Sequence, residues 1–259
     1  TLYAMGHFWV DFSCALLMFS RLSGQGSWGL CMLLYNFCAF ALQMPIGLLA
    51  DRHGRTGRIS ALGCGLSAFG WCLSPVPLAA AAAAGIGNAC FHIGGGLQTL
   101  RDSGNRAAPL GIFVSPGALG IFCGTLLGKR SALPGWLSAA GLLLLVLVFL
   151  RLDAGTERTP SPTAVPPDRN ALWALACCFL VVVLRSCLGM ILSFPWKTGG
   201  WSLAVICGVV VGKAAGGFLG DRLGMLRASV LSLGLSATLF CLSGFPPAGT
   251  AAVLLFNMT

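Results

Sequence analysis

Apolar runs of about 20 residues recur along the whole chain, and this pattern restricts the fold more than any other feature. A run of that length is what an α-helix needs to cross the hydrocarbon core of a bilayer. Charged residues make up only 9% of the 259 residues, against about 25% in soluble domains. Since so few polar groups cannot cover a water-soluble globule, we predict an all-α polytopic membrane protein.

Nine apolar segments and the start of a tenth satisfy this criterion. The first segment carries His7 and Asp11 and is followed by equivalent runs, so we interpret it as a membrane span and not as a cleaved signal peptide. The predicted segments are residues 2–21, 28–50, 59–75, 77–99, 108–128, 134–151, 170–194, 201–220 and 226–244, with the tenth from residue 247 onward.

A short charged turn occurs twice between these segments. The first copy covers residues 47–58 and the second covers residues 217–227, which places Asp51 and Asp221 170 positions apart. A turn of one kind, repeated between membrane-length segments, indicates a duplicated bundle of spanning helices.

The longest polar stretch, residues 152–169, divides the predicted bundle. It is rich in Pro, Thr and Asp and has no hydrophobic periodicity, which is typical of a flexible linker. We predict an N-terminal six-helix half at residues 1–151, this linker, and the start of a C-terminal half, about three and a half helices, at residues 170–259. By the repeat, we expect roughly two further spans to follow.

Lys and Arg are concentrated on one set of turns. The turns after even-numbered segments carry ten of the 16, the turns after odd-numbered segments carry four, and two lie within segments. The positive-inside rule then places the N-terminus and the linker in the cytoplasm, in an inner cell membrane. The net charge of +9 is spread over short turns and forms no patch, which argues against nucleic-acid binding.

The sequence offers no pattern typical of catalysis or of a bound metal. The 12 Cys lie mostly in apolar segments and form no Cys-x-x-Cys pair, which favours a packing role over disulfides or metal sites. The glycine triplet at 94–96 lies within a segment and follows no strand, so it is not a cofactor motif. We predict no enzymatic activity, no cofactor and no metal.

Glycines recur every four residues in two segments, at Gly120, Gly124 and Gly128 and again from Gly208 to Gly224. This spacing places the glycines on one stripe of a helix, where another backbone can approach closely. The alternative is chance, because the chain contains 36 Gly.

Asp11 is an acidic residue inside a predicted segment, where a charge costs about 3 kcal/mol near the bilayer centre. His7 lies one helical turn earlier on the same face. Such a pair can hold or release a proton near neutral pH. We predict that His7 and Asp11 form a proton-coupling site; the alternative is a carboxylate that caps a buried polar network without titrating.

Other polar residues lie in segments that could line a central cavity. Asn88 and His92 are one turn apart in the fourth segment, and Tyr35 and Asn36 lie in the second. We predict that these four residues line a substrate cavity. The alternative for His92 is a hydrogen-bonding residue of the core.

Arg185 is predicted to contribute to the same cavity from the seventh segment. Its forked, permanently charged guanidinium suits a carboxylate or phosphate, so it either pairs with Asp11 or binds an anionic substrate. Lys213 lies near the end of the eighth segment, and we expect its ammonium to extend toward the membrane surface.

The repeated charged turn is predicted to act as a conformational latch. An acid at a helix end can accept hydrogen bonds from a neighbouring helix N-terminus or an arginine, and such a contact can form in one state and break in another. The alternative is a solvated turn that only fixes topology. The predicted latch residues are Gly47, Asp51, Arg52, Gly54, Arg55, Gly217, Asp221 and Arg222.

The turn at residues 47–58 resembles the signature between the second and third spans of the major facilitator superfamily, and residues 217–227 resemble its second copy. Residues 6–11, together with Phe91, His92 and the glycines after them, resemble the fosmidomycin-resistance branch of efflux transporters. The resemblance implies two six-helix halves, an inward-facing N-terminus and transport by alternating access.

These observations together favour a secondary active transporter. The leading prediction is proton-coupled export of a small amphipathic or anionic solute, with the solute, H⁺ and the lipid bilayer as partners. Two alternatives are metabolite uptake by symport or facilitated diffusion, and a membrane scaffold or sensor that has this fold but does not transport.

Overall fold

The protein is described by a computed structural model that covers residues 2–154, 169–170, 172–173, 176–177, 179–181, 184 and 193–259. Within these residues the regular structure is entirely helical, as predicted. The helices are α1 (Leu2–Leu17), η1 (Met18–Leu22), α2 (Trp28–Asn36), η2 (Phe37–Ala41), α3 (Gln43–His53), α4 (Thr56–Cys72), α5 (Pro77–Asp102), α6 (Ala108–Lys129), α7 (Gly135–Ala154), α9 (Gly199–Leu223), α10 (Met225–Phe240) and α11 (Pro246–Phe256). Six helical stretches among the described residues are long and apolar enough to cross a membrane.

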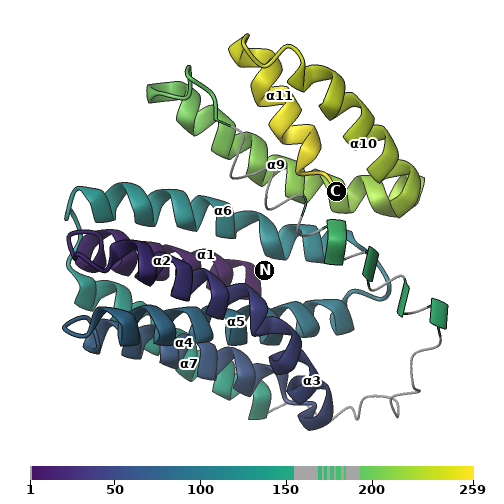
Figure 1. Ribbon diagram of the computed structural model, residues 1–259. Coiled ribbons are helices and arrows are strands. Elements are labelled where there is room, and N and C mark those ends of the chain that lie inside the picture. Colours follow the sequence, from purple (N-terminus) through teal and green to yellow (C-terminus); the bar gives the residue numbers. More distant parts are fainter. Residues whose placement is uncertain are drawn as a thin grey trace.

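The helices up to α7 form one bundle, and α9, α10 and α11 form a smaller group beside it (Figure 1). Helix α6 lies between the two groups and packs against α1 on one side and α9 on the other (Figure 1). Close packing of α6 on α9 requires glycine, because an added Cβ at Gly111 would lie 2.7 Å from the Lys213 carbonyl oxygen.

The contact between α1 and α6 depends on the glycines that recur every four residues. An added Cβ at Gly120 or Gly124 would collide with the carbonyl oxygen of Phe8 or Phe12, respectively, and one at Gly128 would lie 2.9 Å from the Phe19 Cβ. Each glycine therefore lets the two backbones approach more closely than any side chain allows. The packing role predicted for this stripe is confirmed.

The second predicted span is not one continuous α-helix. Helix α2 changes into the π-helical segment η2, and α3 begins two residues after it. Pro45 has no N–H to donate to the carbonyl of Ala41, which is the last residue of η2. A wider turn at this point relieves the missing hydrogen bond, which the apolar pattern alone did not predict.

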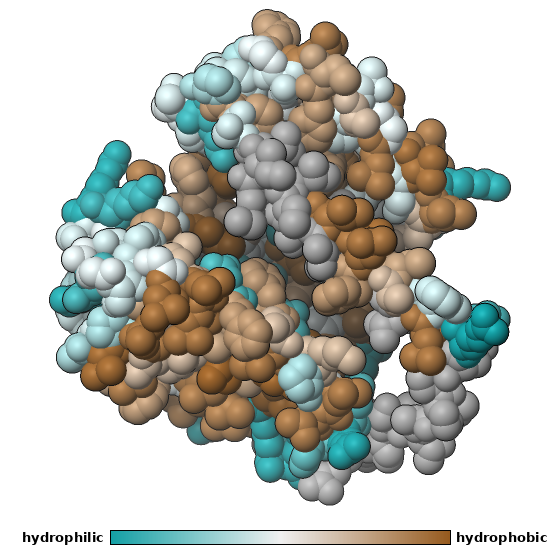
Figure 2. Space-filling view, in the orientation of Figure 1, coloured by the Kyte–Doolittle hydropathy of each residue, from teal (hydrophilic) through white to brown (hydrophobic). Residues whose placement is uncertain are grey.

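Much of the outer surface is apolar, as a membrane environment requires. Leu33 and Phe37 on the second span are 68% and 59% exposed, and similar side chains cover much of the face shown in Figure 2. In water such a surface would drive aggregation, whereas lipid chains solvate it.

The two charged turns lie at the same end of the molecule. Gly54 ends α3 with a φ of 67°, and Arg101 at the end of α5 donates a 3.0 Å hydrogen bond to its carbonyl oxygen. Asp221 at the end of α9 contacts Ala107, five residues after α5 ends. This placement agrees with the prediction that both turns lie on one side of the bilayer.

We expect Gly124→Ala to destabilise the protein by about 1–3 kcal/mol, because the new methyl group would force α1 and α6 apart. Thermal unfolding in lipid nanodiscs measures the effect. Gly234→Ala is the matched control, since Gly234 lies in α10 with open space around its Cβ position. That control should be neutral or stabilising by up to about 1 kcal/mol; equal melting temperatures for the two variants would contradict the packing argument.

Candidate functional site

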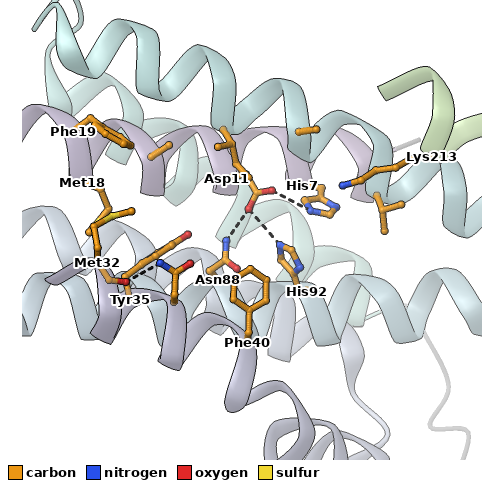
Figure 3. A pocket seen from close by; sticks show the side chains of 15 residues that line it. His7, Asp11, Met18, Phe19, Met32, Tyr35, Phe40, Asn88, His92 and Lys213 are labelled. Carbon is orange, nitrogen blue, oxygen red and sulfur yellow. Dashed lines mark hydrogen bonds and ion pairs between the residues drawn. The ribbon is translucent and has the colours of Figure 1, made fainter. Parts of the chain in front are cut away.

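A cavity of about 400 Å³ opens between α1, α2, α5, α6 and α9. Six of the residues predicted to form the site line it: His7, Asp11, Tyr35, Asn36, Asn88 and His92. Figure 3 shows the polar side chains of α1 and α5 facing each other across this space. The remaining lining residues are Ala15, Met18, Phe19, Met32, Phe40, Val114, Ala118, Ile121 and Lys213.

Asp11 is the centre of the polar network, and it is only 5% exposed. Its Oδ1 accepts a 2.7 Å hydrogen bond from the Asn88 amide and lies 3.3 Å from His92 Nε2. Its Oδ2 lies 3.2 Å from His7 Nε2. Helix α1 supplies the carboxylate and one imidazole at four-residue spacing, and α5 supplies the amide and the other imidazole at the same spacing.

The hydrogen bonds of His7 determine where its proton lies. Its Nδ1 is 2.9 Å from the carbonyl oxygen of Phe113, which can only accept, so Nδ1 carries a hydrogen. In a neutral imidazole Nε2 would then be unprotonated, with its lone pair facing Asp11 Oδ2. Two acceptors 3.2 Å apart repel each other, so this contact requires one further proton, on Nε2 or on the carboxylate.

Pro116 in the middle of α6 explains why a backbone carbonyl of this helix is turned toward His7. Proline lacks the N–H that would bond to the Ile112 carbonyl, and the Ser115 hydroxyl donates to that oxygen instead, at 3.2 Å. The loosened turn leaves the next carbonyl, that of Phe113, able to accept from His7.

Gly117 makes room for the pair. A Cβ at this position would lie 2.5 Å from both Asp11 Oδ2 and His7 Nε2. Any other residue would therefore push the two side chains apart. Sequence reasoning did not identify this glycine, because its role depends on the register of α6 against α1.

Lys213 differs from the prediction. It comes from α9, and its side chain lines the cavity instead of extending toward the membrane surface. In Figure 3 its ammonium nitrogen points toward His7. Arg185, the cation that was predicted for the cavity, lies outside the described residues.

The cluster has the spacing of a possible metal site, since His7, Asp11 and His92 offer ligand atoms within 4.8 Å of one another. A divalent cation there would face the Lys213 ammonium across the same cavity and the Asn88 N–H on the carboxylate. The ammonium is already a cation and the amide N–H already occupies one carboxylate oxygen, and both disfavour a further cation. The arrangement suits a proton network better.

Asp221 of the second charged turn caps a helix of the other helix group. Its Oδ1 and Oδ2 accept hydrogen bonds of 2.6 and 3.0 Å from the backbone N–H groups of Ala107 and Ala108, at the start of α6. A carboxylate at a helix N-terminus satisfies orphan donors and interacts favourably with the helix dipole. These hydrogen bonds join α9 to α6. Gly217, one turn earlier, faces the same junction, where an added Cβ would lie 2.7 Å from the Ala107 carbonyl oxygen.

The first charged turn is held differently. Among the described residues Asp51 makes no hydrogen bond or ion pair, whereas Arg55 and Arg58 lie 3.9 and 3.0 Å from the buried carboxylate of Asp153 at the end of α7. Gly47 packs on α5, with its Cβ position 3.8 Å from Ile93 Cδ1.

The two remaining latch candidates, Arg52 and Arg222, are exposed and form no polar contact within the part of the chain that the structure describes. The sequence pattern is thus repeated, but the contacts it makes are not. The sequence pattern did not indicate Asp153 as a partner of the first turn, because Asp153 falls in the predicted linker at residues 152–169.

The sequence matches no protein-family model, and no curated protein is significantly similar to it. Among solved structures, the chain resembles the crystal structure of the Escherichia coli fucose:proton symporter, with a TM-score of 0.67 and 14% identity over 100% of this chain and 80% of that one. At this identity the similarity shows the fold, and the predicted major-facilitator-type bundle is confirmed. The resemblance to the fosmidomycin-resistance branch stays a prediction.

We expect Gly117→Ala to lower stability by about 1–3 kcal/mol, because the methyl group would separate His7 from Asp11. Thermal unfolding measures the loss, and its dependence on pH between about 5 and 8 should flatten as the shared proton is lost. Gly96→Ala is the control, since its Cβ would make an ordinary 3.7 Å contact with Phe113. A Gly117→Ala protein with an unaltered pH profile would contradict this role.

We expect Asp221→Ala to release the start of α6, because two backbone donors lose their acceptor. Hydrogen–deuterium exchange of a peptide covering residues 105–112 should become several-fold faster. Arg222→Ala, which removes an exposed neighbour without such contacts, should leave exchange unchanged. Identical exchange in both variants would show that the cap does not hold the helix.

Proposed function

We propose that this protein is a secondary active transporter of an inner cell membrane, which moves a small solute by alternating access and couples that movement to protons. The observation that carries the proposal is the His7–Asp11 contact. As the geometry stands, it requires one shared proton in a buried site that opens onto a cavity between two helix groups.

Loss of that proton gives a physical reason for conformational change. An unprotonated His7 Nε2 and the Asp11 carboxylate would repel each other at 3.2 Å, so the side chains or their helices must move apart. Protonation restores the attraction. A site whose two protonation states demand different geometries can drive a switch between two conformations.

Helix α6 offers a route from the proton site to the junction between the helix groups. It provides the Phe113 carbonyl that accepts from His7, and it begins at Ala108, whose N–H bonds to Asp221 of α9. These points are five residues apart, or about 7.5 Å along the helix axis. A shift of α6 that follows the His7 proton would therefore act directly on the Asp221 contact.

The direction of transport rests on the sequence resemblance, which favours export. Uptake by symport or facilitated diffusion is the second candidate, and the solved structure similar to this chain is described as a fucose:proton symporter. A scaffold or sensor with this fold is a candidate of another class. It would need neither an exchangeable proton at Asp11 nor an open cavity.

We expect Asp11→Asn to abolish proton-driven accumulation, because an amide cannot exchange the shared proton. Proteoliposomes under an imposed pH gradient, tested with radiolabelled sugars, amino acids, organic acids and cationic dyes, measure accumulation. In the variant any solute carried by the wild type should only equilibrate between the two sides. The sign of wild-type movement distinguishes export from uptake.

Asp102→Asn is the matched control, since Asp102 lies at the end of α5 and outside the cavity. It should retain accumulation. An Asp11→Asn protein that still concentrates a solute with only a pH difference as the energy source would overturn the proton site. A wild type that moves no solute of the panel would favour the scaffold or sensor.

A further inference from the structure

We propose that His92 is the residue through which the proton shared by His7 and Asp11 passes to and from the cavity, whereas His7 only holds that proton. The proposal rests on the proposed function and names a further residue in the proton path of the same site. It assigns different roles to two imidazoles that contact the two oxygens of one carboxylate.

The shared proton lies where water has little access. The side chains of His7 and Asp11 are 4% and 6% exposed. The ring of Phe113 lies 4.7 Å from that of His7, and Gly117 passes so close to the pair that no side chain fits between. A proton held between His7 and Asp11 therefore needs a carrier to reach the water of the cavity.

His7 cannot be that carrier. An imidazole relays a proton by accepting it on one ring nitrogen while it releases another from the opposite nitrogen. The Nδ1 hydrogen of His7 is bonded to the Phe113 carbonyl oxygen at 2.9 Å, and a backbone carbonyl accepts a hydrogen bond without taking the proton. The proton of the pair must therefore leave through Asp11.

The other oxygen of Asp11 leads to the cavity. Its Oδ1 contacts two groups of α5, the Asn88 amide at 2.7 Å and His92 Nε2 at 3.3 Å. An amide does not titrate, whereas an imidazole exchanges protons near neutral pH. Tyr35 and Lys213 also line the cavity, but among the described residues the titratable side chains in contact with the carboxylate are the two histidines.

His92 is the most accessible member of this network. Its side chain is 22% exposed, against 6% for Asp11, and it lines the cavity. Figure 3 shows its ring extending from α5 toward Asp11. Its Nδ1 forms no hydrogen bond with any residue that the structure describes, so this nitrogen can exchange a proton with water in the cavity.

The transfer balances without a further reactant. When the pair has lost its proton, neutral His92 donates its Nε2 hydrogen to Asp11 Oδ1. Uptake of a proton from cavity water on Nδ1 gives an imidazolium, which transfers the Nε2 proton to Oδ1 and becomes neutral again. A half-turn of the carboxyl group brings the protonated oxygen to His7 Nε2. The same steps in reverse release the proton when the cavity opens to the other side of the membrane.

The distance between the two imidazoles makes His92 a carrier and not a second storage site. The ring centroids of His7 and His92 lie 4.3 Å apart. Two imidazolium charges at this distance repel each other, so His92 passes on its proton or returns it to water while His7 holds one.

Proton exchange of the histidine rings tests the proposal without a known solute. The chain has three histidines, so the ring signals of isotope-labelled histidine can be assigned by single His→Gln variants of the full chain in lipid nanodiscs. After transfer into heavy water, we expect the Nδ1 hydrogen of His7 to persist at least about tenfold longer than the ring hydrogens of His92. In His92→Gln, whose amide can donate to Asp11 but cannot relay a proton, exchange of the shared proton should slow by at least about tenfold.

Chemical rescue separates proton transfer from a structural role. For any solute that the wild type accumulates in proteoliposomes, His92→Ala should slow proton-driven movement by at least about tenfold. Added imidazole should restore part of the rate, because it can enter the cavity beside the space left by the side chain. Pyrrole, which has a similar shape but no basic nitrogen, should not. His53→Ala is the matched control, since His53 is exposed at the end of α3, and its rate should be unchanged.

The proposal is overturned if the His7 ring exchanges as fast as that of His92, if His92→Gln leaves exchange of the shared proton unchanged, or if imidazole and pyrrole act alike on His92→Ala. If the His92 variants do not fold, the comparison of the two rings in the wild type decides the question. Failure of the proposed function looks different: no solute is moved, while the exchange rates still test the proton path. Conversely, proton-driven transport that His92→Gln does not slow would leave the proposed function standing and remove only this proposal.

Discussion

The structure depends on a single carboxylate in a place where water cannot solvate it. A charge near the centre of a bilayer costs about 3 kcal/mol, and Asp11 is nearly inaccessible. The surrounding helices offset this cost with polar partners for the carboxylate: an amide and an imidazole from α5 and an imidazole from α1. Asn88, His92 and His7 therefore fix how α1 and α5 face each other, and the cavity opens where these polar groups meet.

The sequence of helix α6 reconciles two requirements that conflict: close packing against its neighbours and the stability of the helix itself. Packing against α1 and α9 needs glycine at the points of closest approach, and these residues weaken a helix by about 0.5–1 kcal/mol each. Pro116 weakens it further by removing a hydrogen bond. The same two choices make the carbonyl of Phe113 accessible to His7 and leave space at Gly117 for the pair. Local irregularity in α6 is thus the means by which the surroundings of His7 and Asp11 are built.

The two charged turns show how a repeated sequence can acquire different contacts. Asp221 accepts from the first N–H groups of α6, while the arginines of the first turn bind Asp153 at the end of α7. Both arrangements tie a loop to a helix end through a carboxylate. Of these two carboxylate contacts, that of Asp221 joins the two helix groups of the described chain, so a relative movement of those groups must break it.

The sequence by itself determined the all-α membrane bundle and the approximate positions of its spans. It also indicated that His7 and Asp11 share one helix face and that Asn88 and His92 share another. Those features follow from run length and from the helical repeat, which are local properties of the chain. The four-residue spacing of Gly120, Gly124 and Gly128 likewise indicated a packing stripe, although not its partner. The break between η2 and α3 was missed, because its cause is one proline in an otherwise apolar run.

Only the tertiary structure decided which helix faces meet. It brought α5 against α1 at Asp11, turned the Phe113 carbonyl toward His7, and set Gly117 beside the pair. It also directed Lys213 into the cavity, although its distance from the segment end suggested the membrane surface. The physical reason is that the rotation of a helix about its own axis is fixed by contacts with its neighbours, and those contacts join residues that are far apart in the sequence.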